Sequence, residues 1–361
     1  MSAPLKLAII GTNWITNSFV QSAHESKRFQ LVAVYSRSLE TARKFVSETP
    51  SITDPSSVKS YDDLDALLSD GAVSVDVVYI ASPNSLHYQQ GLLALNAGKN
   101  VIMEKPIASN VKEMEALYSL ADSKGLFLLE AFRHIQEPNF IKLRTLLDSE
   151  TTEAGKFGPI YGASVSMAVY SSRYAKVLAG EEPNVLSPKF SGGALWDMGC
   201  YPVMFSVALF GKPAAQAYHP TIIRTGVDGG GHIILQYSTE SSRHKAKFTV
   251  HAHTSKIYTS TAPTEIYCEK GTVRVNGDTG VTDINTIEFV PRGSKEGEQL
   301  ADTKPEYQGM LNLTWEAKEL GRIVQEGDRK AEGTLRVLTT DVLTAMESMR
   351  KQNHIVFESE K

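Results

Sequence analysis

The chain has 361 residues, a length that suits two domains better than one hydrophobic core. Hydrophobic residues make up 42% and charged residues 22%, a globular composition that excludes a largely disordered chain. The formal net charge of −4 gives no basic footprint for nucleic acid, and no stretch approaches the roughly 20 apolar residues of a membrane span.

Cysteine content and the first residues bear on the compartment. Cys200 and Cys268 are the two cysteines, too few for a disulfide framework and in keeping with a reducing environment. Residues 1–6 contain no apolar run of signal-peptide length. We therefore expect a cytoplasmic protein.

The first third of the chain alternates short apolar runs with helical segments. A parallel sheet buried on both faces has this pattern, and the sequence predicts a doubly wound α/β Rossmann domain over residues 1–130. The apolar runs are residues 5–10, 29–35, 75–81, 101–103 and 126–129. One helical segment follows Gly11 and ends at about residue 25, and the others cover residues 39–46, 62–68, 85–97 and 111–123.

After residue 157 the pattern changes to successive strand-like segments, in residues 160–170 and 220–290. Such a series predicts a large, mostly antiparallel sheet in an α+β domain over residues 131–361. Its expected turns are Asp228-Gly229-Gly230-Gly231, Glu269-Lys270-Gly271 and Asn276-Gly277-Asp278. Residues 293–302 are expected to form a polar loop, and closing helices are expected within residues 306–352, at 311–325 and 333–349.

A candidate nucleotide loop lies where the first strand meets the first helix. Its residues are Gly11, Thr12, Asn13, Trp14, Ile15 and Thr16. A Rossmann fold places pyrophosphate at this junction, against backbone N–H groups and the positive end of the helix dipole. Only the first glycine of the G-x-G-x-x-G fingerprint is present, since Asn13 and Thr16 occupy the second and third positions. Asn tolerates unusual backbone angles, so a tight turn remains compatible with the sequence.

The end of the second strand indicates the cofactor. An NAD site places Asp or Glu there to bind the ribose 2′-hydroxyl, whereas this chain has Ser36 and Arg37. Ser36 can donate to a 2′-phosphate, and Arg37 can pair with it or stack on adenine. We therefore expect NADP(H), with NAD(H) possible; the alternative is that Arg37 is an ordinary exposed loop residue.

Three segments resemble one family of enzymes. They are Ala81-Ser82-Pro83-Asn84-Ser85-Leu86-His87, Glu104-Lys105-Pro106, and the run from Gly192 through Leu195 and Asp197 to Tyr201. The sequence resembles the Gfo/Idh/MocA oxidoreductases over nearly its whole length. The tyrosine that ends the last run is similar to the branch containing dimeric dihydrodiol dehydrogenase and NADP-dependent D-xylose dehydrogenase.

The resemblance implies a set of site residues. Gly11, Thr12, Asn13, Trp14 and Ile15 would cover the pyrophosphate, and Ser36 and Arg37 would meet the adenosine end. The nicotinamide-ribose half would lie along Ala81, Ser82, Pro83, Asn84 and His87. Glu104 and Lys105 would sit beside the nicotinamide, with a cis bond before Pro106, and Asp197 and Tyr201 would face the substrate.

Lys105, Tyr201 and Asp197 are the expected catalytic residues. Oxidising a secondary alcohol releases a proton that needs a positioned acceptor. Tyrosine has an unperturbed pKa near 10, and a neighbouring ammonium such as that of Lys105 favours its phenolate. Asp197 and Tyr201 are four residues apart, which would put both on one helical face, but Pro202 disfavours a continuous helix and suggests an irregular turn at Gly199.

Each of these residues also has a structural interpretation. Tyr201 can be a core tyrosine, Lys105 a surface lysine and Asp197 a helix cap. His251 and His253 share one face of a predicted strand, but without a placed carboxylate or cysteine they do not predict a metal site.

Further candidates lie elsewhere in the second domain and near the sheet. Arg133, close to Glu130 and His134, can touch ligand or form a structural ion pair. Tyr170 and Arg173 can line the pocket. Residues 181–185 are expected to form a solvated loop that can cover the site.

The favoured function is an NADP(H)-dependent oxidoreductase acting on a hydroxyl or carbonyl carbon of a sugar, polyol or trans-diol-like small molecule. Two alternatives remain: an NAD-dependent glycoside-cleaving enzyme of the same fold, and a non-catalytic dinucleotide-binding regulator. The open face of an antiparallel sheet, together with the resemblance, predicts a homodimer or a dimer of dimers. No metal, nucleic acid or membrane partner is expected.

Overall fold

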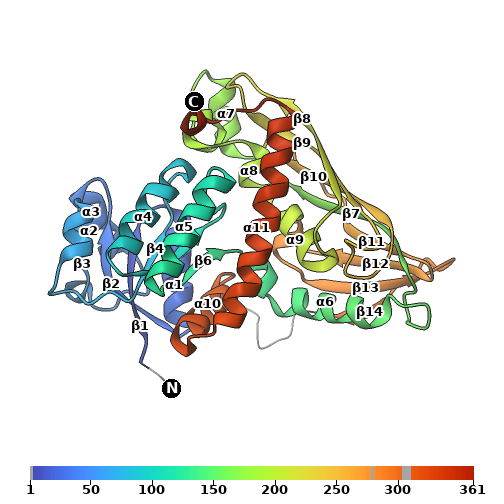
Figure 1. Cartoon of the computed structure of the whole chain (residues 1–361), viewed down its shortest axis with the longest axis horizontal. Helices are drawn as coiled ribbons and strands as arrows, with labels where there is room; N and C mark the ends of the chain where they lie inside the picture. Colours follow the sequence, from blue (N-terminus) through green and yellow to red (C-terminus); the bar gives the residue numbers. More distant parts are fainter. Residues whose placement is uncertain (1–2, 278–279, 303–309) are drawn as a thin grey trace. The chain divides into compact units, whose positions relative to one another are not determined.

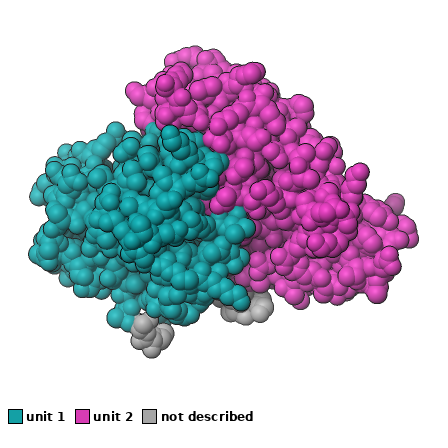
Figure 2. Space-filling model, viewed as in Figure 1, with its two compact units in different colours: residues 1–133, 309–337 teal, residues 134–308, 338–361 magenta. Residues whose placement is uncertain are grey.

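The computed structural model of the protein describes residues 3–277, 280–302 and 310–361. Its elements are labelled in Figure 1. The chain forms two compact units: residues 1–133 with 309–337, and residues 134–308 with 338–361, which Figure 2 distinguishes in teal and magenta. The division at residue 130, with all of residues 306–352 in the second domain, stays a prediction about folding domains.

The first unit contains a six-stranded, wholly parallel sheet in the order β3-β2-β1-β4-β5-β6. The strands are β1 (Leu5–Ile10), β2 (Phe29–Tyr35), β3 (Lys59–Tyr61), β4 (Val77–Ile80), β5 (Asn100–Glu104) and β6 (Leu128–Ala131). The helices between them are α1 (Trp14–Glu25), α2 (Leu39–Glu48), α3 (Leu64–Ser69), α4 (His87–Asn96) and α5 (Val111–Lys124). The strand order reverses between β1 and β4, the position where doubly wound sheets bind ligands.

A helix from late in the chain completes the first unit. α10 (Thr314–Glu326) contributes three buried residues, and Leu313 just before it a fourth, to the core that contains Phe19, Val20 and Phe29. Gly321 is needed for this contact because a Cβ there would lie 2.6 Å from Cβ of Arg28. A strip of apolar residues on a helix distant in sequence therefore covers the amino-terminal part of the fold.

The second unit contains an eight-stranded sheet in the order β14-β13-β12-β11-β7-β10-β9-β8. The strands are β7 (Ile160–Ala168), β8 (Ala215–Ile222), β9 (Asp228–Tyr237), β10 (Phe248–Ser255), β11 (Thr264–Cys268), β12 (Gly271–Asn276), β13 (Thr286–Pro291) and β14 (Glu298–Ala301). All pairs are antiparallel except β7 with β10. The predicted α/β sheet followed by a large, mostly antiparallel sheet is confirmed.

The helices of the second unit are α6 (Pro138–Glu150), α7 (Ser172–Leu178), α8 (Ala194–Asp197), α9 (Cys200–Phe210) and the later part of α11 (Arg329–Gln352). Of these, α6, α8 and α9 pack against strands of the sheet, and Figure 1 shows α9 lying against it. Short 3₁₀ helices occupy residues 55–57, 84–86, 133–136, 184–186, 188–190, 280–282 and 358–360. α9 is almost wholly buried, in keeping with its continuous apolar sequence.

Two local predictions were wrong. The Asp228–Gly231 segment is not a turn but the start of β9; the chain turns just before it, where the Ile223 N–H donates to the Val227 carbonyl at 2.9 Å. The glycines serve close packing, since a Cβ at Gly231 would lie 2.5 Å from the His219 carbonyl oxygen. The expected polar loop at 293–302 contains the edge strand β14, because backbone pairing with β13 needs no apolar side chains.

Two other predictions fall partly outside the described residues. Asp278 of the predicted Asn276-Gly277-Asp278 turn and residues 306–309 of the predicted closing segment are not among them. Within residues 3–277, 280–302 and 310–361, no single helix is long and apolar enough to cross a membrane; by length and composition only the bent pair Pro188–Asp197 and Cys200–Phe210 passes that test.

Candidate functional site

The loop after β1 is closed by a glycine that no other residue can replace. Gly11 has φ +105°, and a Cβ on it would lie 2.7 Å from the Ala81 carbonyl oxygen at the end of β4. The ends of the two central strands thus approach each other at the point where the strand order reverses. This is the backbone cradle that the sequence predicts for pyrophosphate.

Asn13, at the position of the second fingerprint glycine, orders the turn through its side chain. Its side-chain oxygen caps α1, accepting the N–H groups of Ile15 at 3.0 Å and Thr16 at 3.1 Å. Its amide nitrogen donates to the Ala81 carbonyl at 2.7 Å, so one side chain ties the helix start to β4. Trp14 is exposed beside this cap and Thr16 is buried beneath it. The departure from the glycine fingerprint therefore still gives an ordered turn.

The end of β2 presents a cation to solvent. Arg37 is exposed, and it has no hydrogen-bond or ion-pair partner among the residues that the structure describes. Ser36 is half-buried beside it, and its N–H donates to the Tyr61 carbonyl at 3.1 Å. An unpaired guanidinium is the arrangement expected of a phosphate-binding residue.

The segment after β4 is braced by a buried histidine. The His87 ring lies between two backbone carbonyl oxygens, with Nδ1 2.9 Å from that of Pro106 and Nε2 3.0 Å from that of Ser82. Burial lowers the pKa of His87 to about 4, so the ring is neutral near pH 7. Ser82 Oγ also donates to Gln90 at 2.7 Å, while Pro83 and Asn84 begin the next short helix. His87 links the ends of β4 and β5, and its role beside a cofactor stays a prediction.

Glu104 and Lys105 stand at the carboxyl end of β5, followed by a cis Lys105–Pro106 bond as expected. Glu104 Oε1 accepts the Tyr79 hydroxyl at 2.6 Å, and Oε2 accepts the Lys105 N–H at 3.1 Å. Tyr79 in turn stacks on Phe19, with ring centroids 3.8 Å apart. Burial raises the pKa of the Glu104 carboxyl, and the Lys105 ammonium opposes that rise.

A second buried acid in this region escaped the sequence analysis. Glu316 of α10 is 1% exposed, and neither of its carboxyl oxygens has a hydrogen-bond partner among the described residues. Burial first, and then the Glu104 carboxyl, raise the pKa of Glu316 well above its usual range, against the opposing charge of Arg133. A glutamate in an amphipathic helical pattern looks solvent-exposed in sequence, so no signal pointed to it.

In the second unit, Asp197 and Tyr201 flank a break between two helices. Asp197 ends α8 and Tyr201 is the second residue of α9, with Gly199 between them and Pro202 in the first turn of α9. The irregular turn suggested by Pro202 is therefore present. The Tyr201 ring packs edge-on against His134, at 5.4 Å between centroids.

The start of α8 is held by a buried carboxyl that the sequence analysis assigned to a turn. Asp228 Oδ2 accepts the Leu195 N–H at 2.6 Å and the Tyr218 hydroxyl at 2.6 Å. Burial raises the pKa of Asp228, while these donors oppose the rise. A Cβ on Gly193 would lie 2.3 Å from Asp228 Oδ1, so the glycine pair of the motif makes room for this cap.

Asp197 has a cationic partner that the sequence analysis also missed. Lys256, directly after β10, forms a short ion pair with it through Nζ and Oδ2. The lysine side chain is 7% exposed and that of Asp197 23%. A single lysine among strand residues carries no motif, which is why only the tertiary structure identifies it.

Other sequence candidates make hydrogen bonds within their own unit. Glu130 Oε1 accepts the Ile107 N–H at 2.7 Å, and His253 Nε2 lies 3.0 Å from Ser166 Oγ. Among the described residues no group of three or more His, Cys, Asp or Glu could hold a metal ion. Tyr170 is exposed and its N–H donates to Thr259 Oγ1 at 3.0 Å.

Comparisons with known proteins agree with this architecture. Residues 5–132 match the Gfo/Idh/MocA profile described as an oxidoreductase family with an NAD-binding Rossmann fold, and residues 142–274 match the family's C-terminal domain. Scyllo-inositol 2-dehydrogenase (NADP(+)) IolU of Bacillus subtilis is 36% identical over 99% of both chains. The uncharacterized oxidoreductase YgjR of Escherichia coli is 35% identical over 99% of this chain and 98% of its own. In fold, the chain is similar to aldose-aldose oxidoreductase from Caulobacter crescentus, with a TM-score of 0.76, 19% identity and coverage of 97% and 98%.

Proposed function

The chain belongs to the Gfo/Idh/MocA oxidoreductase family, and on that premise we propose that it is an NADP(H)-dependent oxidoreductase. The bound cofactor would accept or donate a hydride at a hydroxyl or carbonyl carbon of a sugar, polyol or diol-like substrate. The observation that carries the proposal is Lys105, at the carboxyl end of β5 in a sheet whose order reverses between β1 and β4. Similarity to a dehydrogenase along 99% of both chains favours this activity over glycoside cleavage or non-catalytic regulation.

The amino-terminal unit fits the dinucleotide. The Gly11 cradle, which a Cβ would fill, suits a pyrophosphate, and Asn13 already occupies the amides of Ile15 and Thr16. Contacts to phosphate would therefore come from the amides of residues 12–14. Ser36 and the unpaired Arg37 would bind the 2′-phosphate, and Ala81, Ser82, Pro83 and Asn84 would line the nicotinamide-ribose half.

Cofactor choice has a direct test. Removing one charge-assisted phosphate contact costs about 1.5–3 kcal/mol, roughly ten- to hundredfold in affinity. We expect Arg37→Ala to weaken NADP(H) by that factor and to leave NAD(H) almost unchanged, as measured by fluorescence titration of both cofactors. Arg43→Ala on α2 serves as the matched control. An unchanged ratio of the two affinities in Arg37→Ala contradicts the assignment.

Proton transfer is assigned to Tyr201, with Lys105 as its partner and Asp197 as a substrate-binding group. The Lys105 ammonium would favour the tyrosine phenolate during oxidation and contact the substrate oxygen. Within its own unit, Lys105 is supported by Glu104, which accepts its N–H, and by the neutral His87 beneath Pro106. These buried contacts fix the strand end from which the lysine projects.

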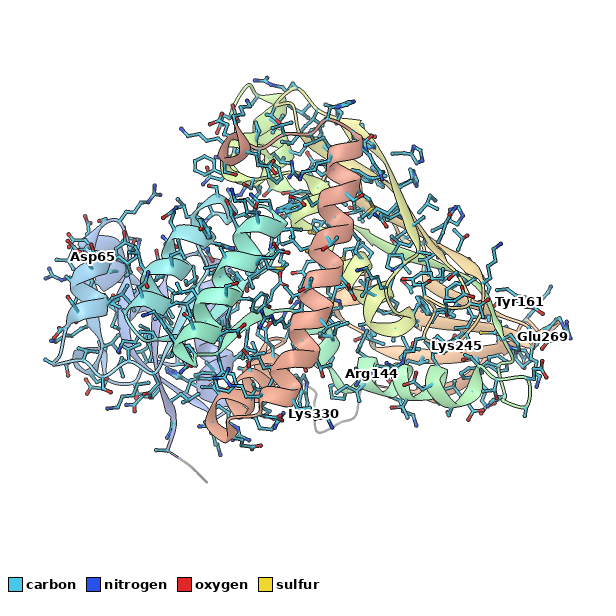
Figure 3. All side chains as sticks on the ribbon, in the orientation of Figure 1. Asp65, Arg144, Tyr161, Lys245, Glu269 and Lys330 are labelled. Atoms are coloured by element: carbon cyan, nitrogen blue, oxygen red, sulfur yellow. The ribbon has the colours of Figure 1, made fainter. Side chains whose placement is uncertain are left out.

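Turnover of Tyr201→Phe tests this assignment. General acid–base assistance is worth about 10²–10⁴-fold, so kcat should fall in that range while cofactor binding and thermal stability stay close to wild type. The kcat of Lys105→Met should fall at least as far, and that of the double variant only a little further, because the two residues act together. Tyr161→Phe, on an exposed tyrosine of β7, is the control (Figure 3). Retention of more than about a tenth of wild-type kcat in Tyr201→Phe rejects the role.

The proposed assembly is a homodimer formed through the outer face of the second unit's sheet. Helices α8 and α9 pack on one face, whereas the other carries Tyr161, Tyr267 and the row His219–His232–His253. Tyr161 is 63% exposed and Tyr267 39%, and a second copy would cover both. Light scattering should give about twice the 39.6 kDa of one chain, and Tyr161→Lys should shift the assembly toward monomer. A wild-type monomer at micromolar concentration rejects the dimer.

The proposed location is the cytoplasm. Cys200 and Cys268 are both buried and form no disulfide, as expected in a reducing compartment.

A further inference from the structure

Lys256 is a fixed lysine rather than a surface one. Its N–H donates to the Gly229 carbonyl at 2.8 Å, and its own carbonyl accepts the Ser171 N–H at 2.9 Å. The preceding Ser255 Oγ accepts the amides of Ile257 at 3.0 Å and Tyr258 at 3.1 Å, which turns the chain after β10. The backbone at Lys256 is therefore bound on both sides.

The partner of Lys256 is equally fixed. Asp197 ends α8, whose first amides are bound by the buried Asp228 carboxyl. On the other side of α8, the Trp196 ring packs edge-on against Phe357 at 5.2 Å between centroids. Within the described residues, Lys256 has no other ion-pair or side-chain hydrogen-bond partner. Two charges are thus held in contact by backbone and core contacts that do not depend on a ligand.

The two members of the pair differ in what they show to solvent. The Lys256 side chain is almost wholly covered and its ammonium is paired with Asp197, whereas 23% of the Asp197 side chain is exposed. Asp197 is therefore the accessible member of the pair, and its carboxylate can accept hydrogen bonds from hydroxyl groups. A carboxylate or phosphate on an approaching molecule would meet a like charge at Asp197, whereas the Lys256 side chain is nearly covered.

From this arrangement we propose that the Asp197–Lys256 pair is a specificity device that selects neutral, hydroxyl-bearing substrates and rejects their acid counterparts. The proposal rests on the function given above, because it places Asp197 at the substrate. Lys256 acts through Asp197: its ammonium holds the Asp197 side chain in place, and Asp197 covers the lysine. When the Asp197 carboxylate is removed, the Lys256 ammonium is left to attract acidic molecules.

The experiment measures equilibrium binding of D-glucose and D-glucuronate to the full-length protein saturated with NADP(H), at low salt to limit screening. These probes share a ring and differ in a hydroxymethyl against a carboxylate. Wild type should bind D-glucuronate at least about tenfold more weakly than D-glucose. Asp197→Asn should bind D-glucuronate at least about tenfold more tightly than wild type does, because the Lys256 ammonium is exposed to it.

Double variants identify the source of that gain. Asp197→Asn with Lys256→Met should lose it, whereas Asp197→Asn with Lys176→Met, which removes an exposed lysine of α7, should keep it. The proposal is overturned by equal wild-type affinities for the two probes, by the absence of a gain in Asp197→Asn, or by a gain that survives Lys256→Met. Because binding is measured rather than turnover, hydride transfer to a polyol panel, followed by NADPH absorbance, reports separately on the proposed function.

Discussion

The two units hold their buried and half-buried acids in different ways. In the first unit, Glu104 and Glu316 lie near each other, and burial raises the pKa of both carboxyls. In the second unit, Asp197 is paired with the ammonium of Lys256, and Asp228 is surrounded by N–H and O–H donors. A carboxyl inside a protein can keep a proton, a cation or a set of hydrogen-bond donors. Each solution predicts a different response to mutation and to pH.

The largest effect is expected at the ion pair between Asp197 and Lys256. Lys256→Met removes the nearly covered ammonium from this pair, and breaking a fully buried ion pair costs about 3–5 kcal/mol. Since Asp197 is 23% exposed, we expect a loss of about 2–4 kcal/mol in urea unfolding. Adding Asp197→Asn should restore most of it, because the pair can be replaced by neutral groups. A loss below about 1 kcal/mol in the single variant would show that water already compensates Asp197.

Asp228 should tolerate the removal of one donor better. Tyr218→Phe deletes the hydroxyl that donates to Oδ2 but leaves the Leu195 amide in place. We expect a loss of about 1–3 kcal/mol, the range for leaving a buried acceptor without one of its donors. Tyr170→Phe, at a tyrosine that is 46% exposed, is the matched control. If Tyr218→Phe lost as much free energy of unfolding as Lys256→Met, an acid held by several donors would be no more tolerant of losing one than an acid paired with a cation.

The effect of Glu316 is expected in the pH dependence of folding stability. Its folded-state pKa lies above that of the unfolded chain, so between the two values the folded state binds more protons and stability falls as pH rises. Relative to wild type, Glu316→Gln should therefore gain stability from pH 5 to pH 8, by up to about 1.4 kcal/mol per pH unit while only the folded form retains its proton. Melting temperatures across this range measure it.

The control for the pH effect is Glu115→Gln, an exposed acid on α5. It should follow the wild-type curve. Parallel curves for wild type and Glu316→Gln would mean that Arg133 already keeps the Glu316 carboxyl ionised.

The smallest effect is expected for an ion pair in water. Lys176 Nζ lies 3.3 Å from Glu181 Oε2, but both side chains are about half exposed, at 48% and 59%. Lys176→Met should change the free energy of unfolding by less than about 0.5 kcal/mol. A cost approaching that of Lys256→Met would show that burial does not set the strength of these pairs.

Local sequence was enough for the elements whose pattern is periodic and whose neighbours are close in the chain. The run Phe29–Tyr35 was predicted with its observed bounds, because a strand buried on both faces is continuously apolar. Helix α6 was not predicted, since its weak amphipathic pattern gives little signal. Asp228–Gly231 was taken for a turn because glycines favour turns as well as close backbone packing.

By itself, the sequence determined the alternation of strands and helices in the first unit, apart from the short strand β3, and it predicted the loop after β1 and the motifs that contain Lys105 and Tyr201. These follow from local periodicity and from short motifs, which contiguous residues specify. Only the tertiary structure decided that Asn13 ties α1 to Ala81, that Lys256 meets Asp197, and that Glu316 joins Glu104 in the core. These partners lie 68, 59 and 212 residues apart, and pairing across such separations is set by packing, which no local pattern encodes.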